Sequence, residues 1–198
     1  MTRLLRAAAL ALVLFTVALP GRDLRAWSLD TPLSQADAFF LGEGEQDFAG
    51  YDAFLGGDVN GDGIDDMLIG AVADSDGAPY AGQVYLLLGR NGGWAGDQGL
   101  GLSDASFQGE GLMDTAGWSV AIVGDVDGDG YDDILIGAPI NAESGEQAGQ
   151  TYLVRGVAAG WAMDASLGSV DASCHGEAEL DWSGWAVDGA GDVNGDGY

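Results

Sequence analysis

Short apolar runs rich in branched side chains alternate with polar segments rich in Gly and Asp along much of this chain. Clear examples are residues 105–108, 119–123, 134–137 and 151–154. Runs of four or five apolar residues bounded by turn residues predict β-strands, and no window shows a sustained helical stripe with caps. The acidic segment 125–133 lies between two of these runs, so it is expected to form a long hairpin turn.

The pattern recurs at one fixed offset without a gap. The series includes Phe40, Gly42 and Glu43, then Phe107, Gly109 and Glu110, then Cys174, Gly176 and Glu177. Self-similarity at a fixed period is typical of repeat architectures. Four short strands per unit, with Gly at the turns, favour the blade of a β-propeller, in which each small sheet packs against its neighbours.

The predicted fold class is therefore all-β: a partial β-propeller of four-stranded, 67-residue blades. The units span about residues 34–100, 101–167 and a truncated 168–198. A propeller usually closes with roughly 4 to 8 blades, and about 2.6 units are present, so we expect the sequence to be a fragment of a longer protein.

The first 26 residues have the pattern of a secretory signal peptide. Arg3 and Arg6 precede an uncharged stretch, residues 7–19, which Pro20 and Gly21 close. Thirteen residues form roughly 20 Å of helix, short of the roughly 30 Å hydrocarbon core, so a transmembrane span is the weaker interpretation. The body, residues 27–198, is predicted to be secreted or displayed at the cell surface.

Composition narrows the possible partners. The chain has 32 acidic residues against 6 Lys plus Arg, a formal net charge of -26, which argues against nucleic-acid or anionic-membrane partners. Hydrophobic residues make up 47% of the chain, enough to build a core. With a single Cys, no intramolecular disulfide can form.

The acidic turns have the spacing of calcium loops. Residues 58–66 and 125–133 place oxygen-bearing side chains at loop positions 1, 3, 5 and 9, and residues 192–198 begin a third copy. With a main-chain carbonyl near position 7, this set suits the six to eight oxygen ligands of Ca²⁺. Zinc would favour Cys or His, and Mg²⁺ keeps several waters. An EF-hand needs Glu at position 12, where this chain has Ile69 and Ile136.

The series Phe107, Gly109, Glu110, Gly117, Trp118, Ser119 and Val120, followed by the acidic loop and by Ile136, Gly137, Ala138 and Pro139, resembles the FG-GAP repeat. This repeat is the blade unit of the integrin α-subunit β-propeller, and the resemblance covers about residues 38–198. It implies a seven-bladed propeller with Ca²⁺ in certain hairpin loops. The first unit departs from the pattern, with Val72 in place of the Pro.

The candidate calcium ligands are the loop residues that match this pattern, with Ile64 and Tyr131 contributing main-chain carbonyls. They are Asp58, Asn60, Asp62, Ile64 and Asp66 in the first loop, Asp125, Asp127, Asp129, Tyr131 and Asp133 in the second, and Asp192, Asn194 and Asp196 in the third. The second loop has four carboxylates and the first has three, so charge alone predicts tighter binding in the second.

Two further expectations concern residues outside the loops. Cys174 stands where Phe40 and Phe107 stand in the earlier units, which predicts a buried apolar role. The recurring rings Tyr51, Trp118 and Trp185 favour a role in the core between blades, with a carbohydrate platform as the alternative.

The expected function is that of a secreted or cell-surface propeller, stabilised by bound Ca²⁺, which serves adhesion or ligand binding with an extracellular protein or a carbohydrate as the partner. No Ser nucleophile with a base, no phosphate loop and no second His is found, so this region is expected to be non-catalytic. The alternative is a propeller module of an extracellular hydrolase or lyase whose catalytic domain lies elsewhere.

Overall fold

The computed structural model describes residues 36–191. The predicted signal peptide, residues 1–26, and the third-loop residues Asp192, Asn194 and Asp196 lie outside the described residues. The strands and loops described in this subsection and the next belong to residues 36–191.

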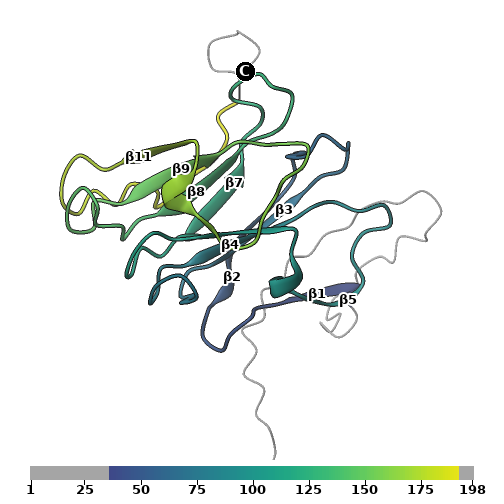
Figure 1. Cartoon of the computed structure of the whole chain (residues 1–198), viewed down its shortest axis with the longest axis horizontal. Helices are drawn as coiled ribbons and strands as arrows, with labels where there is room; N and C mark the ends of the chain where they lie inside the picture. Colours follow the sequence, from purple (N-terminus) through teal and green to yellow (C-terminus); the bar gives the residue numbers. More distant parts are fainter. Residues whose placement is uncertain (1–35, 192–198) are drawn as a thin grey trace, which may run out of the picture.

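Two antiparallel sheets form the body of the molecule, and Figure 1 shows them side by side. The strands of the first sheet are, in spatial order, β2 (Ala49–Leu55), β3 (Met67–Ala71), β4 (Gln83–Leu87) and β6 (Ala105–Gln108). Those of the second are β7 (Ser119–Ile122), β8 (Ile134–Ala138), β9 (Gln150–Val154) and β11 (Ala172–His175). The described residues include only short 3₁₀ turns, Leu100–Leu102 and Leu167–Ser169, as helix. The all-β prediction of four-stranded blades in a partial, unclosed propeller is confirmed.

Two short parallel pairings extend the repeat. Strand β1 (Ala38–Leu41) pairs with β5 (Gly96–Gly99), placing Phe40 opposite Gln98. Strand β10 (Ala165–Ser166) pairs with β6 and places Phe107 opposite Ala165. Both partners in the second pair lie one repeat period beyond those in the first. Strand β1 is therefore the structural equivalent of β6.

The sheets are out of phase with the repeat units. Residues 105–108 are expected from the sequence to share a unit with 119–154, yet β6 pairs with β4 of the preceding sheet. The fourth strand of the second sheet is instead β11, which pairs with β9. A periodic sequence has no intrinsic starting point, so its period cannot indicate which sheet receives a strand that lies between two units.

Burial on both faces explains the apolar runs. Every residue of β3 and β4 is buried. In β3, Leu68 packs into the cluster shared with the second sheet, which includes Ile122, whereas Met67 and Ile69 pack into the cluster on the other side, which includes Phe40. In the sequence, a strand that is buried on both faces is a nearly continuous run of apolar residues.

The second sheet has one fully covered face. In β8, Ile134 and Ile136 are buried against the first sheet, while Leu135 between them is only partly buried. Leu135 is the repeat equivalent of Leu68 in the first unit, so it occupies the face that the next unit would cover in a repeat array.

Backbone hydrogen bonds join successive units at fixed positions. The Gly109 N–H donates to the Gly82 carbonyl at 2.9 Å. The equivalent residues of the next unit repeat this bond, since the Gly176 N–H donates to the Gly149 carbonyl, also at 2.9 Å. These bonds continue the β4–β6 and β9–β11 pairings beyond the strand ends, so each sheet holds its fourth strand in the same register.

The recurring aromatic residues form a stack that crosses the units. The ring centroids of Tyr51 and Trp118 lie 4.7 Å apart, as do those of Trp118 and Trp185. The predicted contact between the rings of successive units is confirmed, but the predicted core position is wrong for Tyr51 and Trp185. Tyr51 is 48% exposed and Trp185 is 49% exposed, so the stack also presents a surface to solvent.

The predicted burial of Cys174 is wrong, because its thiol is exposed. In the earlier units a Trp packs edge-on against the equivalent ring: Trp94 covers Phe40, and Trp161 covers Phe107. No aromatic partner of this kind covers Cys174 within residues 36–191.

At Gly70 the backbones of two successive units approach each other closely. A Cβ at Gly70 would collide with the carbonyl oxygen of Gly117 in the next unit. We expect Gly70→Ala to lower the free energy of unfolding by about 1–3 kcal/mol, measured by urea denaturation, because the two sheets must move apart to admit the methyl group. Gly99→Ala is the matched control, since no atom lies within 4 Å of the added Cβ. Equal stability of the two variants would contradict this explanation.

Candidate metal centre

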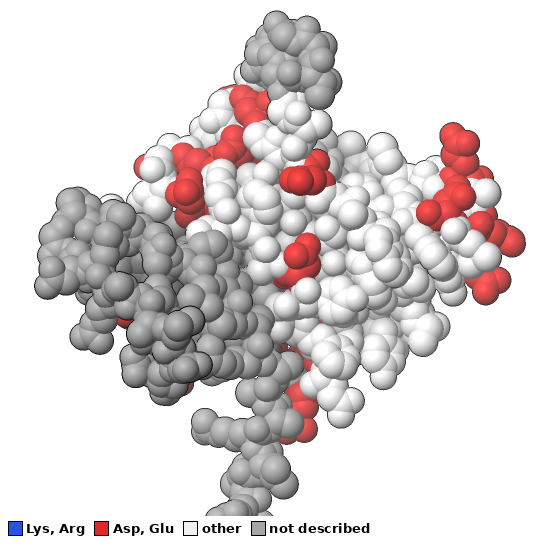
Figure 2. Space-filling view, turned by 180° about the vertical axis from the view of Figure 1, so that it is seen from behind, with Lys and Arg blue, Asp and Glu red and all other residues white. Residues whose placement is uncertain are grey.

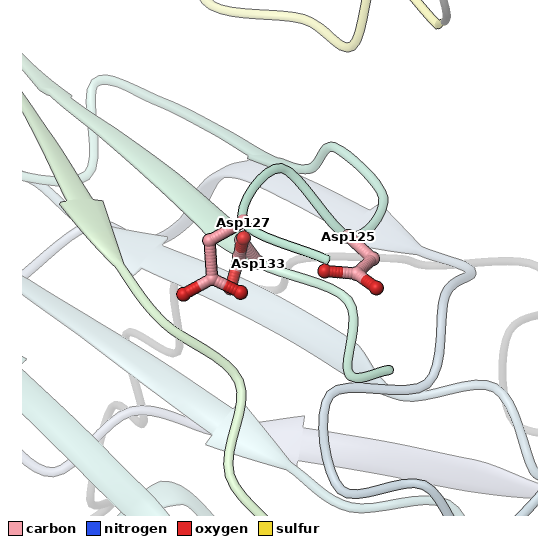
Figure 3. Close-up of side chains that lie close together, drawn as sticks. All are labelled: Asp125, Asp127 and Asp133. Atoms are coloured by element: carbon pink, nitrogen blue, oxygen red, sulfur yellow. The ribbon is translucent and has the colours of Figure 1, made fainter. Parts of the chain in front are cut away.

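The two acidic loops connect the first and second strands of each sheet, between β2 and β3 and between β7 and β8. In the second loop, Asp125, Asp127 and Asp133 each offer a carboxylate oxygen, and these oxygens lie within 4.8 Å of one another (Figure 3). Three anionic groups this close repel one another unless a cation or hydrogen-bond donors compensate.

Backbone N–H groups curl the second loop around Asp125. Its Oδ1 accepts from Gly128 at 2.7 Å, and its Oδ2 accepts from Gly130 at 2.8 Å. Gly130 has φ +95°, a left-handed conformation that favours glycine. Desolvation raises the pKa of Asp125, but the backbone hydrogen bonds together outweigh it and lower the pKa. Asp125 is therefore ionised at neutral pH.

Asp133 anchors the base of the loop. Its carboxylate is fully buried and accepts the Val126 N–H at 2.9 Å and the Gly156 N–H at 2.8 Å. Burial raises its pKa, the two hydrogen bonds partly offset that shift, and the carboxylates of Asp127 and Asp129 raise it further. The loop is thus tied to the segment that follows β9.

Asp129 and Tyr131 complete the predicted set for this loop but lie outside the three-carboxylate cluster. Asp129 Oδ1 accepts the Tyr131 N–H at 3.0 Å. The structure therefore brings together three of the four predicted carboxylate ligands.

The first loop shares the scaffold and differs in its side chains. Asp58 accepts N–H groups from Asp62 at 3.0 Å and from Gly63 at 2.7 Å, in the manner of Asp125. Asn60 Nδ2 donates to Asp62 Oδ2 at 3.1 Å, so positions 3 and 5 bond to each other. The Ile64 N–H donates to Asp62 Oδ1 at 2.9 Å. Within residues 36–191, no three-carboxylate cluster forms in this loop.

Asp66 is the buried anchor of the first loop. It accepts the Val59 N–H at 2.8 Å and the Gly89 N–H at 2.7 Å. Desolvation raises the pKa of Asp66 to about 6, the two hydrogen bonds oppose this, and the charges of Asp58 and Asp62 add to it.

The donor chemistry fits a hard divalent cation. The clustered ligand atoms of the second loop are all carboxylate oxygens, which Ca²⁺ prefers. Backbone N–H groups that donate to Asp125 and to Asp133 hold two of the three carboxylates in place. A bound cation would relieve the repulsion within this cluster.

Two residues at the loops were missed by sequence reasoning. Asp132 links the loops, because its Oδ2 accepts the Asp58 N–H at 2.7 Å and its own N–H donates to the Asp58 carbonyl at 3.1 Å. The recurrence of Asp65 and Asp132 at loop position 8 was the available signal. Arg155, the second such residue, lies within 3.2 Å of Asp127. No sequence pattern pointed to it.

Acidic groups are scattered over the rest of the surface. Figure 2 shows several on one face, where no Lys or Arg of the described residues is visible. The cations in the described part are Arg90 and Arg155, and both pair with Asp side chains.

Comparison with known families gives a match to both loop-bearing segments. The family model described as FG-GAP repeat matches residues 49–87 and 116–154. The chain contains FG-GAP repeats. The two matches begin one repeat period apart and each spans three strands and one acidic loop, so the resemblance seen in the sequence is confirmed.

Relatives of these FG-GAP repeats include integrin α chains and a phospholipase. The chain is 31% identical over 165 residues to integrin alpha-5 of Xenopus laevis, covering 80% of this chain and 15% of that protein. It is 38% identical over 109 residues to human integrin alpha-IIb, covering 52% and 10%. It is 33% identical over 140 residues to phosphatidylinositol-glycan-specific phospholipase D of Dictyostelium discoideum, covering 68% and 14%. The chain thus matches a small part of each relative.

The described FG-GAP region was also searched for membrane spans. Among its helices, none has the length and apolar character needed to cross a bilayer.

The raised pKa values predict how stability depends on pH without metal. Burial raises the pKa of Asp66, Asp74, Asp114 and Asp133 above 3.8. Such groups retain a proton in the folded protein at a pH where the unfolded chain has lost it. Their stabilisation is complete below about pH 4 and is lost as the pH rises through the folded pKa, about 6 for Asp66.

We therefore expect the free energy of unfolding, measured with a chelator present, to be at least about 1 kcal/mol higher at pH 5 than at pH 7.5. Asp125, whose pKa is lowered, opposes this trend only at more acidic pH. Equal or lower stability at pH 5 would contradict the assignment of burial as the dominant cause.

Proposed function

We propose that this FG-GAP chain is a secreted or cell-surface, calcium-binding β-propeller protein that binds an extracellular protein or carbohydrate. The observation that carries the proposal is the cluster of Asp125, Asp127 and Asp133 in a hairpin loop of an FG-GAP repeat. The proposed ligands of the first loop are Asp58, Asn60, Asp62, the Ile64 carbonyl and Asp66. Those of the second loop include Asp129 and the Tyr131 carbonyl, and the third loop contributes Asp192, Asn194 and Asp196.

Calcium would act on this chain by stabilising the assembly of its units. The carboxylates hold each loop in a tight turn, and a divalent cation supplies the charge that keeps them close. Asp132 of the second loop accepts a hydrogen bond from Asp58 of the first. A conformational change in one loop would therefore affect the conformation of the other. Ca²⁺ is thus proposed to reinforce the packing of neighbouring blades.

The proposed domain organisation is a signal peptide, residues 1–26, followed by propeller repeats over residues 27–198. The integrin relatives support an extracellular location and a ligand-binding role. On the chain itself, the half-exposed rings of Tyr51 and Trp185, with the partly buried ring of Trp118 between them, offer an apolar surface on which a protein side chain or a sugar ring could pack.

A second proposal is that these repeats belong to an extracellular hydrolase or lyase as a non-catalytic module. The match to a phosphatidylinositol-glycan-specific phospholipase D favours it. Incubation of the chain with polysaccharide and with glycosylphosphatidylinositol-linked substrates distinguishes the two. The leading proposal predicts no turnover by this region, and release of product would overturn it.

Calcium is expected to stabilise the fold. At a free concentration 100 times the dissociation constant, one site adds about 2.7 kcal/mol to the free energy of unfolding. We expect Asp62→Ala and Asp127→Ala each to remove one binding event in isothermal titration calorimetry, because each deletes a carboxylate from one loop.

Asp97→Ala is the control for loss of one negative charge, since Asp97 lies on the exposed strand β5, away from the loops. It should leave the number of bound Ca²⁺ ions unchanged. Absence of Ca²⁺ binding by the unsubstituted chain would contradict the proposed function.

A further inference from the structure

Arg155 is a cation placed directly at the second acidic loop. It follows strand β9, and its Nη1 lies 3.2 Å from Asp127 Oδ2. Its Nη2 lies 2.8 Å from Asp171 Oδ1, just before strand β11. One guanidinium therefore spans a carboxylate of the loop and a carboxylate outside it.

The first unit has a cation near the equivalent place, but its ion pair does not reach the acidic loop. Arg90 pairs with Asp104, the repeat equivalent of Asp171, at 3.3 Å. The residue one repeat period before Arg155 is Leu88. The backbone is arranged alike at both positions: the Leu88 N–H donates to Asp104 at 2.9 Å, and the Arg155 N–H donates to Asp171 at 3.3 Å. Because the two sites share their main-chain geometry, the difference between them is the side chain.

We infer that Arg155 is a built-in competitor of the divalent cation in the second loop, where it pairs with Asp127 and weakens metal binding. This inference rests on the proposed calcium function. A cation that takes Asp127 as a ligand must either displace the guanidinium or bind beside a positive charge. Asp171 gives the displaced guanidinium a second anionic partner, so Arg155 can release Asp127 without losing both ion pairs.

The pairing changes the ranking of the two loops. Counting carboxylates places the second loop, with four, above the first, with three. Arg155 offsets one of the four charges, so the effective charge of the second loop approaches that of the first. We therefore expect the two loops to bind Ca²⁺ with similar affinity in the natural chain and with different affinities once Arg155 is replaced.

Calorimetric titration of the full chain with Ca²⁺ tests this inference. In an Asp62→Ala background, which disables the first loop, Arg155→Leu installs the side chain found in the first unit. We expect it to lower the dissociation constant of the second loop about threefold to tenfold, since an exposed ion pair accounts for up to about fivefold and loss of the nearby charge adds to it. Arg155→Gln, which removes the charge and keeps a polar side chain, should act in the same direction, and far-UV circular dichroism checks that both variants fold.

Arg90→Leu is the matched control. It changes the net charge by the same amount, but Arg90 pairs with Asp104 and not with a loop ligand. We expect less than a twofold change in the affinity of the second loop. An equal gain from Arg90→Leu would indicate a general charge effect and overturn the inference.

The outcomes separate this inference from the function on which it rests. If the Asp62→Ala chain binds Ca²⁺ and neither Arg155 variant changes its affinity, the inference is wrong and the calcium function stands. If the unsubstituted chain binds no Ca²⁺, the proposed function fails and the inference fails with it.

Discussion

Burial of the sheet faces against neighbouring units is the constraint on which this structure depends. Strands β3 and β4 are buried throughout, so the first sheet must be covered on both of its faces. The two faces of this sheet pack into separate hydrophobic clusters, one shared with the second sheet and one shared with β1. Such packing requires the backbones of successive units to approach closely, which accounts for glycines such as Gly70 facing the next unit's main chain.

The same constraint connects the acidic loops to the packing of the sheets. The Val120 N–H donates to Asp52 at 2.9 Å, and the Val187 N–H donates to Ser119 at 3.2 Å, so a side chain on β2 and one on β7 each bind the next unit. Asp132 joins the two acidic loops of the same units. A charge change in a loop therefore acts on groups that also hold neighbouring units together, and metal affinity and stability should be coupled.

The pattern of neighbouring residues in the sequence was enough to predict the features that depend on nearby residues alone. The apolar runs located strands such as β8, and the spacing from Asp125 to Asp133 located the loop that forms the carboxylate cluster. The sheet that receives β6, the exposure of Cys174 and the contact of Arg155 with Asp127 could not be predicted in this way. Each depends on which segments meet across long sequence separations, and a single sequence with one repeat period leaves that choice open.

The large acidic excess also follows from the architecture. Short strands joined by many turns leave backbone N–H groups without strand partners, and Asp side chains in turns accept hydrogen bonds from such groups. Asp supplies acceptors within reach: Asp47, Asp114 and Asp181, at equivalent positions of successive units, accept N–H groups three residues earlier at 2.6, 2.7 and 2.8 Å. Within the second loop, Asp125 accepts the Gly128 N–H and Asp133 accepts the Val126 N–H. Because an ionised carboxylate accepts without donating, each such turn adds negative charge and requires no matching cation. The acidity of this chain thus reflects how its turns are built as well as any metal they hold.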